Sequence, residues 1–136
     1  MAKTEKRRKP TRLPHQVERA VRAAEDKKAL DLTVLDLRNA SGFTDYFVIC
    51  SGGNPRQVRA IADAVVESLG DEGVKPAHVE GYDRSEWILL DYFDFIVHIF
   101  SPETRAFYAL ERLWGSAERV EIPEPAPNPG SRQSQV

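Results

Sequence analysis

The chain has little of what catalysis at a metal, export or membrane insertion requires. Its 136 residues contain one cysteine and three histidines, and no apolar run reaches the roughly 20 residues that cross a bilayer. A single cysteine excludes a disulfide framework and a thiol metal cluster, and it fits a reducing, cytoplasmic setting. The N-terminus also lacks the apolar segment of a signal peptide. We therefore expect a protein that is neither exported nor embedded in a membrane.

A strong charge of either sign is missing as well. The 19 Lys and Arg residues oppose 21 Asp and Glu residues, which gives a formal net charge of −2. Such a balance produces no overall field that draws the protein to nucleic acid or to a membrane. The cations are instead concentrated between Lys3 and Arg12. We interpret residues 1–12 as a disordered basic arm, which is either a solubilising tail or an extension that touches the phosphates of RNA.

The other end of the chain is rich in proline. Pro123, Pro125, Pro127 and Pro129 alternate with other residues, a pattern that favours extended chain over helix or central strand. Residues 123–136 are therefore predicted to form a disordered tail. Residues 13–122 are predicted to form one α/β domain, which is long enough to bury a single core.

Between these ends, the apolar spacing predicts alternating helices and strands. Helices are expected to start near Pro14, at Asn54-Pro55 and at Ser101-Pro102. Gly70 and Gly73 are expected to stop the second helix, and Gly115 the third. Strands are expected at residues 32–37, 46–50, 77–80, 87–90 and 95–100. Caps and first-turn prolines mark the helices, and apolar runs mark the strands. The run from Tyr46 to Cys50 is apolar at every position, which indicates a central strand. The order predicts a mixed β-sheet flanked by helices.

One predicted strand-to-helix junction has the form of a phosphate-binding turn. The glycines of Ser51-Gly52-Gly53 precede a helix start, where backbone amides can hold a phosphate. Nucleotidyltransferases use such a turn, but they also need two carboxylates one residue apart on a strand. The chain has no such pair. A rival interpretation as a metal-dependent nucleotidyltransferase would take its acids from Asp36, Asp45 and Glu80. The structural interpretation is favoured, because such turns need glycine more often than they bind phosphate.

Other candidates for chemistry are weaker. His98 lies between apolar residues in a predicted buried strand, so we interpret it as a core histidine with satisfied hydrogen bonds, and the three histidines show no metal-ligand spacing. Cys50 and Ser51 have no histidine that the sequence places near them, and Ser51 lies outside a G-x-S-x-G elbow. The sequence therefore predicts no catalytic residue, metal or cofactor.

The segment from Glu80 to Asp94 combines acids with aromatics. It holds five acidic residues, one base and three amphipathic aromatic residues, among them Trp87. Aromatic side chains supply the anchors of interfaces, and an acidic surround steers a basic partner. The segment thus indicates a surface for a positively charged protein. The plain alternative is a solvated hairpin whose Trp87 joins the core.

In the order and spacing of these motifs, residues 16–120 resemble the RsfS (Iojap) family of ribosomal silencing factors. The motifs are Thr44-Asp45-Tyr46-Phe47-Val48-Ile49-Cys50-Ser51-Gly52, Glu80-Gly81, Glu86-Trp87-Ile88-Leu89-Leu90-Asp91-Tyr92 and Asp94-Phe95-Ile96-Val97-His98-Ile99-Phe100. The resemblance implies a nucleotidyltransferase-like α/β fold without the catalytic carboxylates, and a binding protein rather than an enzyme. Members of the family bind a large-subunit ribosomal protein, L-fourteen, and prevent the small subunit from joining, which represses translation.

Carried over to this chain, the resemblance places the partner contact on six residues: Trp87, Leu89, Leu90, Asp91, Tyr92 and Asp94. Trp87 would bury its ring in a pocket of the partner, and Asp91 would face a Lys or Arg. The resemblance also implies a homodimer when the protein is free, with the first helix and the exposed sheet region as candidate contacts. The chain departs from the family at Tyr92-Phe93, where smaller residues such as glycine are expected. An oligomeric adaptor for another basic protein is a third interpretation.

Overall fold

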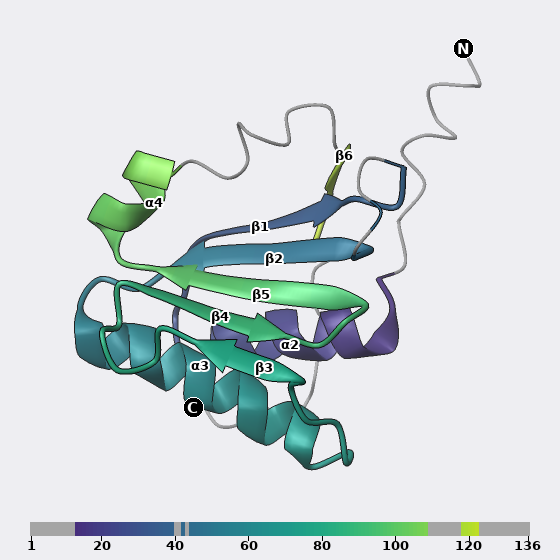
Figure 1. The fold of residues 1–136 in the computed structure, drawn as a ribbon, viewed down its shortest axis with the longest axis horizontal. Coiled ribbons are helices and arrows are strands. Elements are labelled where there is room, and N and C mark those ends of the chain that lie inside the picture. Colours follow the sequence, from purple (N-terminus) through teal and green to yellow (C-terminus); the bar gives the residue numbers. More distant parts are fainter. Residues whose placement is uncertain (1–12, 40–41, 43, 109–117, 123–136) are drawn as a thin grey trace, which may run out of the picture.

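Two helices lie across one face of a six-stranded mixed sheet in the computed structural model (Figure 1). The structure describes residues 13–39, 42, 44–108 and 118–122. The helices are α2 (His15–Asp26), α3 (Pro55–Gly70) and α4 (Pro102–Tyr108), and the strands are β1 (Leu30–Asp36), β2 (Tyr46–Ser51), β3 (His78–Glu80), β4 (Trp87–Asp91), β5 (Phe95–Phe100) and β6 (Glu118–Val120). The predicted mixed α/β fold is confirmed. The predicted basic arm and proline-rich tail lie outside the described residues.

The strand order explains why the middle of the sheet is so apolar. The order is β3-β4-β5-β2-β1-β6, and the β2–β5 pair is parallel whereas the other pairs are antiparallel. Every residue of β2 and of β5 is buried, as expected for parallel neighbours covered on both faces. The prediction that residues 46–50 form a central strand is confirmed.

The helix starts follow from local hydrogen bonding. The Asn54 side chain accepts a hydrogen bond from the Gln57 amide at 2.9 Å, and Pro55 occupies the first turn of α3. The Ser101 hydroxyl likewise accepts from the Thr104 amide at the start of α4. Both predicted caps are confirmed. Pro14 precedes α2 rather than opening it, so this start was predicted one residue early.

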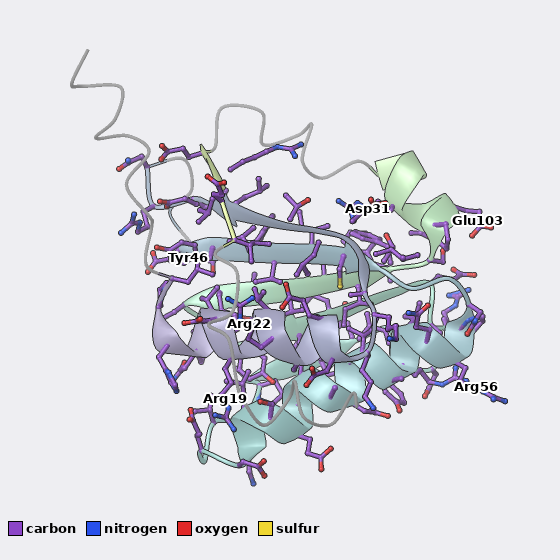
Figure 2. The ribbon with its side chains drawn as sticks, turned by 180° about the vertical axis from the view of Figure 1, so that it is seen from behind. Arg19, Arg22, Asp31, Tyr46, Arg56 and Glu103 are labelled. Atoms are coloured by element: carbon purple, nitrogen blue, oxygen red, sulfur yellow. The ribbon has the colours of Figure 1, made fainter. Side chains whose placement is uncertain are left out.

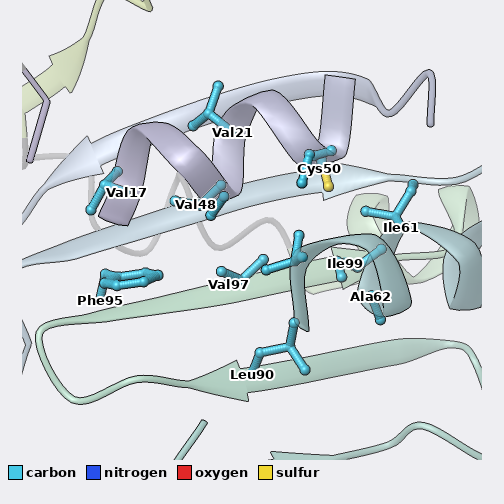
Figure 3. Packing of buried hydrophobic residues seen from close by; sticks show 14 of the residues in the cluster. Val17, Val21, Val48, Cys50, Ile61, Ala62, Leu90, Phe95, Val97 and Ile99 are labelled. Atoms are coloured by element: carbon cyan, nitrogen blue, oxygen red, sulfur yellow. The ribbon is translucent and has the colours of Figure 1, made fainter. Parts of the chain in front are cut away.

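The main core lies between the sheet and the two long helices. Figure 3 shows Val17 and Val21 of α2 and Ile61 and Ala62 of α3 close to the buried strand residues, which include Val48, Cys50, Leu90, Phe95, Val97 and Ile99. Seen from behind, Arg19 and Arg22 extend from α2 on its polar side (Figure 2). The amphipathic pattern of each helix thus fixes which side of the helix packs against the sheet.

One strand was missed by the sequence prediction, and the predicted end of the last helix lies outside the described residues. Strand β6 pairs with β1 through Val34 and Val120, but its three residues are too few and too exposed to show a period. Strand β1 also starts two residues before the predicted range. The predicted continuation of the last helix to Gly115 lies outside the part of the chain that the structure describes.

Candidate partner-binding surface

The alternation of strand β4 separates the predicted contact residues into two groups. Trp87, Leu89 and Asp91 are partly exposed, whereas Ile88 and Leu90 between them are buried. Successive side chains of a strand point to opposite faces, so the first three share the face that α2 and α3 leave uncovered. Glu80 pairs with Leu89 across the β3–β4 ladder and therefore lies on this face too. We call these four residues the Trp87 face.

Trp87 is held against a second, smaller apolar cluster on this face. The cluster consists of buried residues of β1, β2 and β5 and the residue after β1, namely Leu35, Leu37, Phe47, Ile49, Ile96 and Phe100, and Trp87 and Leu89 pack at its border. The indole lies 5.0 Å from the Phe100 ring, measured between centroids. Its Nε1–H donates a hydrogen bond to Nδ1 of His98 at 3.0 Å. One edge of the Trp87 ring is therefore fixed by the sheet, and the side chain as a whole stays partly exposed.

His98 is buried, as predicted, but it is not fully hydrogen-bonded. Because an indole N–H can only donate, Nδ1 must be the acceptor and the proton of the neutral ring must sit on Nε2. Nε2 has no hydrogen-bond partner among the described residues. The Phe47 ring stands edge to face at 4.5 Å, and an aromatic face is only a weak acceptor. The prediction of a satisfied core histidine was thus wrong at this atom, and leaving it unpaired costs about 1–3 kcal/mol.

The burial of His98 makes a pH dependence testable. Burial lowers the pKa of His98 from 6.5 to about 3, so between these values the unfolded chain binds a proton that the folded chain does not. The free energy of unfolding should therefore decrease as the pH is lowered below about 6.5, by up to about 1.4 kcal/mol per pH unit. Denaturant titrations over this range should show a shallower pH dependence for His98→Leu than for the wild type. Equal slopes in the two proteins would contradict a buried neutral imidazole.

The side chains of Leu90 and Tyr92 lie beneath the surface rather than in it. Leu90 is 1% exposed and Tyr92 7% exposed, and both belong to the core under the helices. The Tyr92 ring stacks on Phe95 at 4.9 Å, and burial raises the pKa of its hydroxyl to about 12. The two residues can support a contact surface, but their side chains are not placed to touch a partner.

The turn between β4 and β5 carries an exposed aromatic in an unfavourable backbone conformation. Phe93 has a φ of 72° and is 71% exposed. Its amide donates to Asp91 Oδ1 at 2.9 Å, and its carbonyl accepts from the Thr44 hydroxyl at 2.9 Å. Asp94 is exposed beside it. The left-handed backbone conformation at position 93 explains why glycine was expected at this turn, because glycine adopts it without a steric penalty.

Phe93 offers a direct measure of this backbone strain. A side chain with a Cβ pays about 1–2 kcal/mol in the left-handed region, and glycine escapes this cost but loses part of the gain to its larger entropy when unfolded. We expect Phe93→Gly to be more stable than Phe93→Ala by about 1 kcal/mol, because both lack the ring and differ only at Cβ. Denaturant midpoints at equal m-values measure the difference. An alanine variant as stable as the glycine variant would show that the turn relaxes.

The loop before β4 is tied to helix α3 and does not extend the Trp87 face. The Tyr82 hydroxyl donates to Asp63 at 3.0 Å, and Arg59 donates to the Ser85 hydroxyl at 2.6 Å. Tyr82 thus contacts α3, although the sequence grouped it with Trp87. These tethers hold the loop that leads into β4.

The glycine turn after β2 has a structural explanation. A Cβ on Gly52 would lie 2.8 Å from the Val58 amide nitrogen, so only glycine lets α3 approach this closely. The Gly53 amide already donates to the Gln57 side chain at 2.7 Å, and the Gln57 amide donates to Asn54. Two of the amides that could hold a phosphate, those of Gly53 and Gln57, are therefore occupied from within the turn.

The three acids of the rival enzyme interpretation do not form one site: Asp36 and Asp45 lie near each other at one end of the β1–β2 pair, and Glu80 lies apart from both. Asp36 on β1 forms an ion pair with Arg38 at 2.7 Å, and hydrogen bonds from Arg38 lower its pKa. Glu80 lies on β3 at the opposite end of the sheet order and bonds to His78. Asp45 is exposed ahead of β2. No group of three His, Cys, Asp or Glu residues with metal-binding geometry occurs in the described ranges.

Two further observations concern Cys50 and the helices. Cys50 is buried, and burial raises the pKa of its thiol to about 12, which suppresses the thiolate that a nucleophile needs. Among the described residues, no helix combines the length and apolarity that crossing a membrane requires.

The fold and the Trp87 face define a small α/β domain with a partly exposed aromatic and acidic surface beside a buried core. Comparison with known proteins identifies it further. The family model described as "Ribosomal silencing factor during starvation" matches residues 10–136. The chain belongs to this RsfS family, as the sequence motifs predicted.

Individual relatives agree with the family match. The chain is 40% identical to the ribosomal silencing factor RsfS of Halalkalibacterium halodurans over 103 residues, which cover 76% of this chain and 88% of that protein. It is 34% identical to a mouse protein named mitochondrial assembly of ribosomal large subunit protein 1, over 65% of this chain and 40% of that protein. A crystal structure of a Chromobacterium violaceum protein superposes with a TM-score of 0.74 at 30% identity, covering 87% of this chain and 95% of that one.

Proposed function

We propose that this protein binds the large ribosomal subunit through its L-fourteen type protein and thereby blocks joining of the small subunit. Membership of the ribosomal silencing factor family supports a role at the ribosome. The single observation that carries the proposed contact is Trp87, an indole fixed to the sheet by His98 and still partly exposed beside Leu89 and Asp91. Translation is lowered because the covered surface is one that the small subunit needs.

The Trp87 face has the composition of a protein interface. A fixed, partly exposed aromatic loses little conformational entropy when a partner covers it, which is why Trp is common among interface anchors. Asp91 and Glu80 lie beside Leu89 on the same face and would face Lys or Arg side chains of the partner. Leu90 and Tyr92 would support the strand from the core side, and Asp94 would lie at the edge near the turn. The revised contact set is therefore Trp87, Leu89, Asp91, Glu80 and Asp94.

Steric exclusion needs neither turnover nor a cofactor, and we propose that the protein acts without either in the cytoplasm. The occupied amides of Gly53 and Gln57 and the separation of Glu80 from Asp36 in the sheet order support this proposal. The alternative as a metal-dependent nucleotidyltransferase has no observation in its favour.

Co-sedimentation with isolated large subunits tests the proposal. The wild type should pellet with large subunits, and an excess of the purified L-fourteen type protein should release it. The neutral variants Glu80→Gln and Asp91→Asn should bind more weakly, because they remove charges that steer a basic partner. Their loss of affinity relative to the wild type should be larger at low salt than at high salt. Glu67→Gln is the matched control, since Glu67 is an exposed acid on α3. A wild type that stays in the supernatant, or that recovers a different basic protein from a lysate, would contradict the proposal and favour an adaptor.

We also propose that the basic arm contacts ribosomal RNA near the protein contact. Each phosphate that an arm cation neutralises should contribute about 0.9 to the slope of log affinity against log salt concentration. Deleting residues 2–12 should therefore flatten the salt dependence of large-subunit binding while leaving the Trp87 contact in place. An unchanged slope would assign the arm a solubilising role instead.

We further propose that the free protein self-associates. Helix α2 and the exposed region of the sheet are the candidate contacts, and a homodimer is the expected state. Sedimentation velocity over a range of concentrations measures this directly, and a monomer at every concentration would contradict it.

A further inference from the structure

His98 carries a buried polar atom that the fold does not use. The residue is 3% exposed, and its Nε2 finds no hydrogen-bond partner in the described part of the chain. The ring is surrounded by the aromatic groups of Phe47, Trp87 and Phe100. An apolar side chain of similar volume would fill this place without leaving a buried donor unpaired. For stability alone, histidine is therefore a poor choice at this position.

The one hydrogen bond that His98 makes through its ring in the described structure is to the Trp87 indole. Nδ1 accepts from Nε1–H at 3.0 Å, across the β4–β5 pair. Trp87 is partly exposed, so without the histidine a change of rotamer could bring this N–H to water. The indole N–H thus does not need His98 in order to find a hydrogen-bond partner. The bond to His98 instead fixes the orientation of the indole ring. A Trp side chain on a strand has several allowed rotamers, and the contact with His98 selects one of them.

We propose that His98 is a positioning residue for the partner site, which holds the Trp87 indole in its binding orientation through Nδ1 at the expense of an unpaired Nε2–H. The inference rests on the proposed function for its consequence, because the orientation matters only if Trp87 is the anchor. Preorganising the anchor lowers the entropy that is lost when the partner binds. The low pKa of His98 keeps the ring neutral, and only the neutral ring can accept from the indole.

Three variants separate positioning from packing. His98→Leu removes the acceptor and the orphan donor together and keeps an apolar side chain of similar size. His98→Gln keeps an acceptor. Ile49→Val is the packing control, because Ile49 is the buried residue that faces His98 across the β2–β5 pair and its lost methyl group touches no hydrogen bond.

The first readout is the indole N–H resonance of Trp87 in ¹⁵N-labelled protein, assigned with Trp87→Phe because the chain has two tryptophans. In His98→Leu this resonance should move upfield and its hydrogen exchange should accelerate about tenfold, as expected for a lost hydrogen bond. His98→Gln should retain part of the protection, and Ile49→Val should leave the resonance in place. A His98→Leu protein with an unchanged indole resonance and exchange rate would overturn the inference.

The second readout is affinity for isolated large subunits, measured together with the unfolding midpoint. His98→Leu should bind about tenfold more weakly while its midpoint stays equal or rises, and Ile49→Val should show a lower midpoint with wild-type affinity. A purely structural role of His98 predicts the reverse, with stability lost and affinity retained, and this result would also overturn the inference. If the wild type does not bind large subunits, the proposed function fails, and the indole resonance still decides whether His98 positions Trp87.

Discussion

Trp87→Ala should weaken binding to the large ribosomal subunit at least about thirtyfold. Truncation of a central Trp at an interface typically costs about 2 kcal/mol or more, which corresponds to this factor. The structure adds a reason specific to Trp87, because its ring is already held by His98 and Phe100 before a partner arrives. An alanine loses the contact area and the preorganisation together. Equilibrium titration of labelled protein with large subunits measures the loss.

The controls for Trp87→Ala must show that the domain still folds. The side chain is only partly buried, at the border of the smaller cluster, so its removal should cost less stability than removal of a core residue such as Phe100. Trp87→Phe keeps one aromatic ring but loses the bond to His98 and part of the contact area, and it should bind with intermediate affinity. A folded Trp87→Ala protein with wild-type affinity would remove Trp87 from the interface.

Gly81→Ala should be the most destabilising single methyl addition among the described glycines. Gly81 has a φ of 79°, and a Cβ built on it would overlap the carbonyl oxygen of Trp87. The left-handed conformation costs an alanine about 1–2 kcal/mol, and the overlap with backbone must also be relieved by moving the start of β4. We expect a loss of at least about 3 kcal/mol in the free energy of unfolding, together with weaker large-subunit binding because Trp87 shifts.

Gly73→Ala is the matched control for this prediction. Gly73 has almost the same φ, 78°, but a Cβ there would meet no atom within 4 Å. It should therefore pay only the backbone cost of about 1–2 kcal/mol and leave binding unchanged. The difference between the two variants isolates the contact between Gly81 and Trp87. Equal losses of stability in the two variants would show that the loop before β4 moves away from the added methyl group without an energetic cost.

Periodicity and capping chemistry made most of the fold predictable. The uninterrupted apolar run at Tyr46–Cys50 can only be a covered strand or a buried helix segment, and the glycines after it decide in favour of the strand. Asn54 before Pro55 and Ser101 before Pro102 fix helix starts by chemistry that acts within four residues. Strand β6 could not be found in this way, because its pairing with β1 is a long-range contact.

The candidate site was predictable as a segment but not as a surface. The motif around Trp87 identified the hairpin, yet the resemblance grouped Leu90 and Tyr92 with it, although strand alternation and the Phe95 stack bury them. Tyr82 was grouped with Trp87 by proximity in sequence, and its bond to Asp63 depends on where α3 lies. The role of His98 was missed for the same reason, since only the β4–β5 register brings it to Trp87. A histidine between apolar residues near a Trp on the neighbouring strand is the signal that would have found it.

A subunit-joining assay tests most directly whether the protein keeps the small subunit from the large one. Isolated large subunits are incubated with the wild type, with Trp87→Ala or with buffer, small subunits are added, and the fraction of complete ribosomes is measured on a sucrose gradient. We predict that the wild type suppresses joining in proportion to the large subunits it occupies, and that a folded Trp87→Ala protein does not. Complete ribosomes forming at the buffer level while the wild type remains bound to the large subunit would contradict exclusion by the Trp87 face.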